Sequence, residues 1–306
     1  MSINAHPELP EFDYIHPATL AEASAFLSAH AGEARPLLGG TDIFVRMRDG
    51  VWHDRYLVDV KGLEGTNELH FDTGASNGHK PGLTIGAAVN MNAVIASPAV
   101  QAHYPLLAEA CRWVASYQLR TRATIVGNIC NASPAGDTIG ACIALEGVLN
   151  VHGVGGFRQV PLAGFFKGPG KTLLNPGDIV TSIYFPLPPQ GAAGAYVKLG
   201  RNNWGDLSIV GVTAFGFKDP AAPSGYRFRI ALASVAPIPL TVTQAQDYLN
   251  EHSPEAGAFK EASKLAEAAC NPIDDVRGSA RYRKAMVRTL SEKALLTTWD
   301  RLAGAK

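Results

Sequence analysis

The stretch that most constrains the fold is residues 37–43, which read Leu-Leu-Gly-Gly-Thr-Asp-Ile. The two leucines indicate the end of a short buried strand, and Thr41 and Asp42 are residue types that often begin helices. We expect a short helix from Ile43 to Arg48, closed by Gly50. A strand, a turn without side chains and a helix start present backbone N–H groups and a positive dipole end to an anion. The stretch is therefore either an ordinary tight turn or a phosphate cradle.

A second stretch, Thr124 to Asp137, again combines small residues with hydroxyl and amide side chains. We interpret it as a second ligand-binding loop. Ser133-Pro134 is typical of an N-cap followed by proline at the first helical position, which predicts a helix from Ala135 to Glu146 with a stop at Gly147. Two cradles far apart in the sequence suit a long ligand with a diphosphate in its middle, whereas a mononucleotide would need only one.

Composition narrows the class of protein. The chain has 306 residues, enough for two domains, with 46% hydrophobic and 18% charged residues. Twenty-seven basic residues balance 27 acidic ones, so no global field attracts nucleic acid or an acidic membrane. No apolar run is long enough to span a bilayer, and the N-terminus, with Asn4 and His6, lacks an apolar signal core. We expect a cytoplasmic protein.

Metal chemistry is not indicated by the cysteines or histidines. No two of the four cysteines have CxxC spacing, and the nine histidines form no HxH or HExxH array. We therefore predict that the cysteines are structural or incidental, and reduced, as is usual in the cytosol. Those cysteines are Cys111, Cys130, Cys142 and Cys270.

The N-terminal half is predicted to contain a small β-α-β unit followed by hairpins and helices. A strand at 12–14, a helix that begins at Thr19 with Glu22 completing a capping box, and a strand at 56–60 form that unit. Paired strands are then expected at 68–71 with 83–86, joined by the loop Thr73 to Gly82, and at 148–151 with 157–160. A helix is expected over 105–117.

The C-terminal third changes character after the proline-rich linker Leu187 to Gly191. Alternating patterns predict antiparallel strands at 195–199, 207–217 and 227–235. Helices are predicted at 241–250, 254–269 and 279–302. Strands followed by helices indicate an α+β domain with helices on one sheet face.

Taken together, these landmarks resemble the FAD-binding medium subunits of the molybdenum hydroxylases, which include CO dehydrogenase and xanthine dehydrogenase types. Each motif is weak by itself, but their order covers nearly the whole chain. The matching stretches are Phe12-Asp13-Tyr14, Pro17-Ala18-Thr19-Leu20, Gly39-Gly40-Thr41-Asp42, Ile85-Gly86-Ala87, Arg120 to Thr124, Gly127-Asn128-Ile129, Asn131-Ala132-Ser133-Pro134, Asp137, Tyr196-Val197-Lys198, Arg201, Asp206 and Gly278 to Arg283.

The resemblance implies an α+β fold in three parts. Two FAD-binding subdomains of the vanillyl-alcohol oxidase and p-cresol methylhydroxylase type would occupy residues 1–60 and 61–186. An α+β domain of the CO dehydrogenase flavoprotein type, an antiparallel sheet with helices, would occupy 187–306.

The resemblance also implies where FAD would lie. The backbone of 38–42 and 124–128 would surround the diphosphate and ribityl chain, Ile43 would contact the isoalloxazine ring, and Lys198 would approach its pyrimidine edge. The implied cofactor-binding residues are Pro36, Leu37, Leu38, Gly39, Gly40, Thr41, Asp42, Ile43, Ala87, Thr124, Val126, Gly127, Asn128, Asn131, Ser133, Asp137 and Lys198. No catalytic or metal-ligating residue is implied.

Several of these residues have a plain structural alternative. A cation near a reduced flavin would stabilise its negative charge, but Lys198 could equally be a solvated strand lysine. Asp137 could cap a helix, and Arg201 with Asp206 could form an ion pair. Relatives usually carry Gly-Gly where this chain has Val126-Gly127, and a branched side chain there disfavours positive φ.

The resemblance implies electron transfer as the function. The chain would hold non-covalent FAD within a heterotrimer that pairs into a dimer of heterotrimers, with a molybdopterin-binding large subunit and a 2Fe-2S small subunit. Electrons from the iron–sulfur clusters would pass through FAD to an external acceptor. Two alternatives remain open: a self-contained flavin oxidase of the vanillyl-alcohol type, and a non-catalytic nucleotide-binding or assembly protein.

Overall fold

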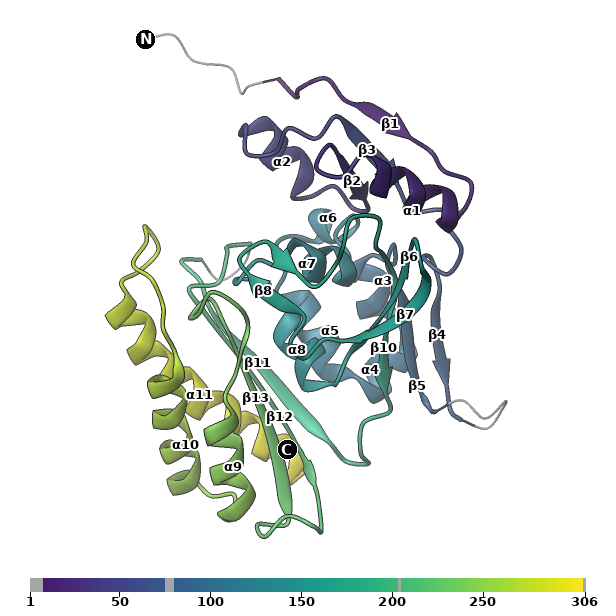
Figure 1. The fold of residues 1–306 in the computed structure, drawn as a ribbon. Helices are drawn as coiled ribbons and strands as arrows, with labels where there is room; N and C mark the ends of the chain where they lie inside the picture. Colours follow the sequence, from purple (N-terminus) through teal and green to yellow (C-terminus); the bar gives the residue numbers. More distant parts are fainter. Residues whose placement is uncertain (1–7, 75–79, 203–204, 305–306) are drawn as a thin grey trace.

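The computed structural model describes residues 8–74, 80–202 and 205–304. The first seven residues, where no signal core is expected, and residues 75–79, inside the expected Thr73–Gly82 loop, lie outside the described residues. The described chain forms three sheets that follow one another along the sequence, with a small two-stranded ribbon beside the second (Figure 1). The mixed helix and sheet content confirms the predicted α+β class. No described helix combines the length and apolar character that a bilayer crossing requires.

The N-terminal sheet is the predicted β-α-β unit. Its strands are all parallel in the order β1-β3-β2. The Thr19 hydroxyl accepts a hydrogen bond from the Glu22 N–H at 3.1 Å, while the Glu22 carboxylate accepts from the Ala18 N–H at 2.8 Å, so the predicted helix start is confirmed. The elements are β1 (Asp13–Ile15), α1 (Leu20–Ala29), β2 (Ala34–Leu37), α2 (Ile43–Arg48) and β3 (Tyr56–Asp59).

The middle sheet is antiparallel, in the order β4-β5-β10-β6-β7. The two predicted hairpins are present, but they lie on opposite sides of a central strand, β10, which the sequence analysis left unassigned. The strands are β4 (Leu69–Asp72), β5 (Gly82–Gly86), β6 (Val148–Gly153), β7 (Gly156–Pro161) and β10 (Ile179–Pro186), with the small ribbon formed by β8 (Phe166–Gly168) and β9 (Lys171–Thr172).

Short helices cover this sheet, and several differ from expectation. The helix predicted over 105–117 ends at Arg112, because Ala115 takes a positive φ of 40° and Ser116 caps a new turn. The helix predicted from Ala135 begins only at Ile139. The helices are α3 (Met91–Ala96), α4 (Pro98–His103), α5 (Pro105–Arg112), α6 (Tyr117–Arg120), α7 (Ile125–Asn131) and α8 (Ile139–Ala144).

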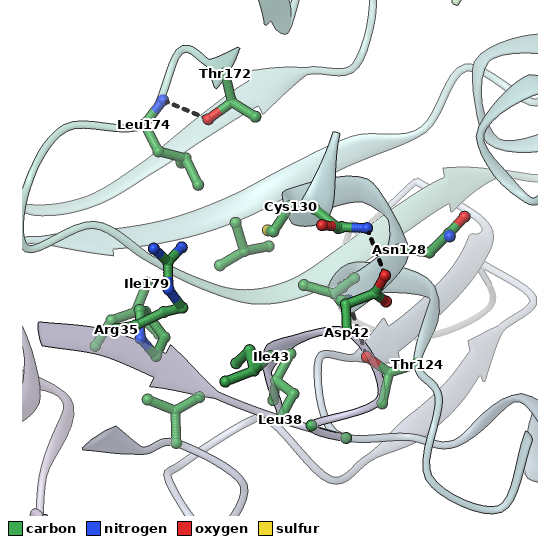
Figure 2. A pocket seen from close by; sticks show the side chains of 18 of the residues that line it. Arg35, Leu38, Asp42, Ile43, Thr124, Asn128, Cys130, Thr172, Leu174 and Ile179 are labelled. Carbon is green, nitrogen blue, oxygen red and sulfur yellow. Dashed lines mark hydrogen bonds between the residues drawn. The ribbon is translucent and has the colours of Figure 1, made fainter. Parts of the chain in front are cut away.

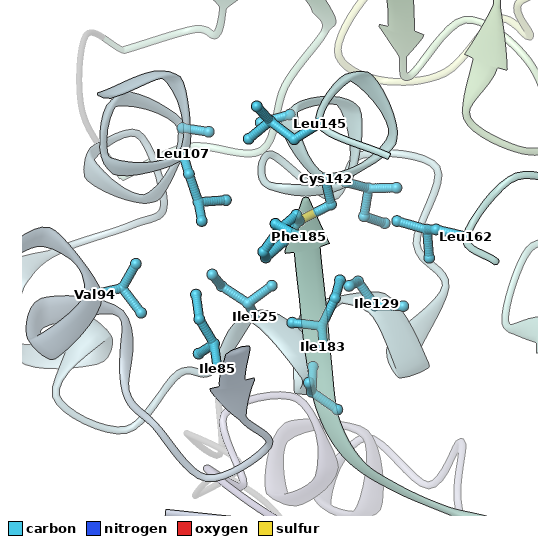
Figure 3. Close-up of a cluster of buried hydrophobic side chains, with 14 of the residues drawn as sticks. Ile85, Val94, Leu107, Ile125, Ile129, Cys142, Leu145, Leu162, Ile183 and Phe185 are labelled. Atoms are coloured by element: carbon cyan, nitrogen blue, oxygen red, sulfur yellow. The ribbon is translucent and has the colours of Figure 1, made fainter. Parts of the chain in front are cut away.

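The core of this middle part lies between β10 and the helices. Figure 3 shows Ile183 and Phe185 of β10 surrounded by Leu107 of α5, Ile125 of α7 and Cys142 of α8. All five side chains are fully buried. Burying each large apolar side chain contributes about 1.5–3 kcal/mol, so this contact fixes α7 and α8 firmly on the sheet.

The C-terminal sheet has the order β11-β12-β13-β14 and carries α9, α10 and α11 on one face, as predicted (Figure 1). Its other face packs against the middle part, which the sequence did not indicate. On β12, Val212 and Ala214 pack with the helices, while Phe215 and Phe217 pack into the middle core. The elements are β11 (Ala193–Leu199), β12 (Val210–Lys218), β13 (Tyr226–Ala233), β14 (Leu240–Thr241), α9 (Thr243–Glu251), α10 (Ala256–Ala269) and α11 (Ala280–Leu302).

The three sheets fall within 1–60, 61–186 and 187–306, and we refer to these ranges as the N-terminal, middle and C-terminal domains. Their borders remain a prediction.

Candidate functional site

A cavity of about 400 Å³ lies between the N-terminal and middle domains. Figure 2 shows that three segments far apart in the sequence face one another across it. One wall is the end of β2 with residues 38–43, the second is residues 123–131, and the third is residues 170–180. This volume is typical of a small-molecule or cofactor site.

The first two walls touch at Gly39. A Cβ atom at this position would lie 2.1 Å from the Arg122 carbonyl oxygen, so only glycine allows the loops to approach this closely. Gly40 follows with a φ of +73°, a conformation that glycine adopts without strain. The Gly-Gly pair is therefore required by the contact between two domains as well as by the turn.

The first loop presents free donors. The backbone N–H groups of residues 39–42 donate to no acceptor within the described ranges, and these residues line the cavity. Backbone N–H groups that point at a ligand, next to a helix start, suit an anion. The cradle interpretation of this stretch is thus the one that the geometry supports.

Asp42 differs from its expected role as a helix cap. It occupies the N-cap position of α2, but its side chain makes no capping hydrogen bond. Its carboxylate instead accepts a hydrogen bond from the Asn131 amide across the cavity, at 3.0 Å (Figure 2, dashed line at Asp42). The Asn131 Oδ1 atom is buried without a partner among the described residues. An acceptor left in this state can take a hydrogen bond from a bound ligand or a water molecule.

The second stretch is helical where a loop was expected. Thr124 is the N-cap of α7, and its hydroxyl accepts from the Gly127 N–H at 2.9 Å. The concern about a positive φ at Val126 was wrong, because this residue lies inside α7 without a positive φ and is buried. A valine is compatible with a helical backbone, and its side chain packs in the middle core.

Asn128 and Ser133 are held by short-range bonds. The Thr138 hydroxyl donates to the Asn128 Oδ1 atom at 2.7 Å, and the Ser133 hydroxyl accepts from the Ala135 N–H at 3.3 Å. Ser133 therefore stabilises a turn, whereas the helix that it was expected to cap begins six residues later.

Asp137 and Lys198 meet each other away from the cavity wall. The Asp137 carboxylate accepts from the Lys198 ammonium at 2.8 Å and from the Tyr196 hydroxyl at 2.6 Å. Lys198 also donates to the Trp113 carbonyl and its side chain is only 4% exposed, so it is not a solvated lysine. Burial raises the pKa of Asp137, and Lys198 and Tyr196 oppose that shift.

Twelve of the seventeen expected residues line the cavity, and five do not. Leu37 and Ala87 are buried behind the wall, and Ser133, Asp137 and Lys198 lie outside it. The twelve that line it are Pro36, Leu38, Gly39, Gly40, Thr41, Asp42, Ile43, Thr124, Val126, Gly127, Asn128 and Asn131. The expected ion pair of Arg201 with Asp206 is present at 3.1 Å, and the guanidinium lowers the pKa of Asp206 to about 2.

The third wall was missed by the sequence analysis. Residues 175–178 read Asn-Pro-Gly-Asp, a turn signal, but nothing local connects this turn to residues 38–43. The Ser24 hydroxyl of α1 donates to the Gly177 carbonyl at 2.8 Å, which ties the turn to the N-terminal domain. Arg158 binds Asp178 in a bidentate pair at 2.7 and 2.6 Å. Burial opposes ionisation of Asp178, but hydrogen bonds from Arg158 and the Asn175 N–H lower its pKa overall.

Cys130 also lines the cavity. Burial raises the pKa of its thiol to about 12, so the group is a neutral thiol at physiological pH. All four cysteines are free, as the sequence analysis predicted.

These features fit a ligand that combines an anionic centre with hydrogen-bond donors. The free N–H groups of 39–42 suit a diphosphate, the orphaned Asn131 oxygen suits a hydroxyl or amino donor, and two domains contribute walls. An α+β fold with a cavity between two domains and these donors supports the class of dinucleotide-binding proteins.

The family models agree with that class. The model described as the FAD binding domain in molybdopterin dehydrogenase matches residues 10–188, and the CO dehydrogenase flavoprotein C-terminal domain matches residues 195–298. The chain therefore belongs to the family of FAD-binding subunits of the molybdenum hydroxylases. Its cofactor is FAD, and it is an FAD-dependent oxidoreductase subunit.

Individual relatives match over nearly their whole length. The carbon monoxide dehydrogenase medium chain of Hydrogenophaga pseudoflava is 33% identical, covering 96% of this chain and 99% of the relative. The putative xanthine dehydrogenase FAD-binding subunit of Escherichia coli strain K12 is 30% identical, covering 92% and 94%. A chain in the solved carbon monoxide dehydrogenase of Hydrogenophaga pseudoflava has a TM-score of 0.89 at 32% identity, covering 96% and 99%.

Proposed function

We propose that this chain is the electron-transfer subunit of a multi-subunit molybdenum hydroxylase. It holds FAD non-covalently, receives electrons from iron–sulfur clusters on a small partner chain and passes them to an external acceptor. Substrate oxidation belongs to a molybdopterin-binding large partner chain. The names of the relatives, medium chains and FAD-binding subunits, support this division of labour.

The observation that carries the proposal is the meeting of residues 38–43 and 124–131 at one cavity. The close contact of Gly39 with Arg122 and the Asp42–Asn131 hydrogen bond join two domains around a set of free N–H donors. FAD, when bound, supplies the redox chemistry. In the proposal the backbone of 38–42 and the first turn of α7 hold its diphosphate and ribityl chain, and Ile43 contacts the ring.

Non-covalent attachment is supported by the lining of the cavity. Covalent flavin tethers commonly use His or Cys side chains, and no histidine is among the described lining residues. The Cys130 thiol is there, but its raised pKa leaves it protonated and poorly nucleophilic.

The test begins with the purified chain. We expect flavin absorbance at close to one FAD per chain, and release of all flavin into the supernatant on acid precipitation. Flavin that stays with the precipitate would favour a self-contained oxidase of the vanillyl-alcohol type. A colourless chain that ignores added FAD would contradict the proposal and favour a non-catalytic nucleotide-binding or assembly protein.

The assembly is tested in the native host. We propose a dimer of heterotrimers in the cytoplasm, which agrees with four free thiols. Affinity purification of the tagged chain is expected to recover two further chains together with molybdenum and iron. A complex without either metal would overturn the assembly while leaving the FAD site in place.

A further inference from the structure

The C-terminal domain contributes no residue to the described cavity wall, whose members all lie between residues 27 and 180. Residues of this domain nevertheless donate hydrogen bonds to a single turn, residues 134–137, which links α7 to α8. The Ser234 N–H donates to the Pro134 carbonyl at 2.7 Å, and the Ser208 hydroxyl donates to the Ala135 carbonyl at 3.3 Å. Two further donors from β11 bind the Asp137 carboxylate, as described above.

Ser208 and Ser234 are themselves held in place by contacts within the C-terminal domain. The two hydroxyl oxygens lie 2.6 Å apart, and Ser234 has a φ of +66°, a strained conformation that persists only when its surroundings hold it. Arg283, which is 2% exposed, donates to the Ser234 carbonyl at 3.0 Å and to the Ile209 carbonyl at 2.9 Å. The C-terminal side of this contact is therefore held by several hydrogen bonds.

On its other side, the turn is connected to the cavity wall through Asn128. Thr138, fully buried, donates to the Asn128 Oδ1 atom at 2.7 Å. Gly136 packs against the same oxygen, because a Cβ there would lie 3.1 Å from it. The Asn128 amide nitrogen donates to no residue in the described ranges, and Asn128 lines the cavity. Because the Asn128 Oδ1 atom already accepts from Thr138, the amide N–H groups of this side chain are the atoms that can donate to a ligand.

We propose that Thr138 is a positioning residue for FAD. It holds the Asn128 amide so that its N–H groups face the anionic diphosphate, and the C-terminal domain presets this arrangement through Ser208 and Ser234. The inference rests on the proposed FAD site. It assigns the C-terminal domain a role in cofactor affinity although, within residues 187–202 and 205–304, none lines the cavity.

The test is a double-mutant cycle on FAD dissociation constants, measured by flavin fluorescence with the apo-form of the full chain. Asn128→Ala and Thr138→Val are each expected to weaken binding about tenfold, the loss of one hydrogen bond to a charged group. The double variant is expected to bind no more weakly than Asn128→Ala, and Thr138→Ser to bind like the wild type. Thr298→Val is the matched control, because this buried hydroxyl donates only to the Ala214 carbonyl.

The outcomes separate the inference from the proposed function. A wild-type chain that binds no FAD overturns the proposed function. Wild-type binding with additive losses in the double variant, or with no loss in either single variant, overturns the positioning role alone. Should Thr138→Val fail to fold, Ser208→Ala serves in its place: it is expected to weaken FAD binding in the wild type and to have no effect in the Asn128→Ala background.

Discussion

At the scale of single residues, Gly39 has the least freedom to change. Gly39→Ala would place a methyl group 2.1 Å from the Arg122 carbonyl oxygen, a backbone atom that cannot move aside cheaply. We expect the variant to fold, because each domain keeps its own core, but to separate the two loops and lose most bound FAD. Flavin absorbance per chain measures this directly.

Gly62→Ala is the matched control for Gly39→Ala. No atom lies within 4 Å of a Cβ built on Gly62, and its φ is not positive, so normal FAD content is expected. Full occupancy in Gly39→Ala would show that the contact with Arg122 is not needed for the cradle.

The buried pair of Asp137 and Lys198 gives a second prediction at this scale. Either Asp137→Asn or Lys198→Met alone removes one partner of an ion pair whose side chains are 8% and 4% exposed, and should cost about 3–5 kcal/mol of unfolding free energy. The double variant should lose much less, because no unpaired charge stays buried. Urea unfolding of the four proteins measures the coupling.

The same four proteins address the role expected for Lys198 toward the flavin. If Lys198 stabilises reduced flavin, the reduction potential falls in the double variant relative to the wild type. If Lys198 interacts with Asp137 and the Trp113 carbonyl but not with the flavin, the potential stays constant while stability changes. Additive losses in unfolding free energy would contradict the pairing itself.

Local sequence predicted the position of Asp42 but not its bond. The pattern of residues 37–43 correctly placed a strand, a turn and a helix start, since these depend on neighbouring residues. The acceptor role of the carboxylate depends on Asn131, which is 89 residues away. The stretch around Val126 was interpreted as a loop, and this led to the concern that the residue would need a positive φ. Because Val126 lies in α7, no positive φ is needed.

At the scale of elements, periodic patterns predicted the C-terminal strands and helices well. The middle domain was harder, because its helices are short and their order is set by packing. Residues 179–185 have the composition of a strand, yet their place between two hairpins depends on pairing with β5 and β6. The Thr124 hydroxyl was a usable N-cap signal for α7 that the loop interpretation overlooked.

Asp178, in the turn before β10, gives a prediction about how the stability of the protein depends on pH. The pKa of Asp178 is lower in the folded state than its ordinary value, so the pair with Arg158 contributes stability above the unfolded carboxyl pKa, about 3.9. That contribution is lost as the pH falls through the lower folded value. Arg158→Gln should therefore be less stable than the wild type at pH 5–7, and the difference should shrink below about pH 4.

Thermal unfolding between pH 2.5 and 7 measures the Arg158→Gln effect. Lys264→Gln is the control, because Lys264 forms an exposed i,i+3 pair with Glu261 on α10, and such pairs contribute little. A stability difference for Arg158→Gln that is the same at pH 3 and pH 7 would contradict the role given to Asp178.

At the scale of the whole molecule, three contacts around the cavity help to hold the N-terminal domain in place, beside the apolar packing of Ile179 against α1 and β3. Gly39 touches Arg122, Asp42 accepts from Asn131, and Ser24 donates to Gly177. The third wall could not be predicted, because its Asn-Pro-Gly-Asp turn meets α1 only through a contact 153 residues apart in the sequence. A ligand that fills the cavity bridges all three segments at once.

This arrangement predicts that FAD protects the three walls together. A ligand at about 100 times its dissociation constant stabilises the bound state by about 2.7 kcal/mol. Hydrogen–deuterium exchange with and without FAD should therefore slow in residues 38–43, 124–131 and 170–178 in parallel. The distant helix α10 should change little in local exchange and serves as the internal control. Protection of one wall without the other two would mean that the ligand occupies one domain alone, and that the cavity does not act as a single site shared between domains.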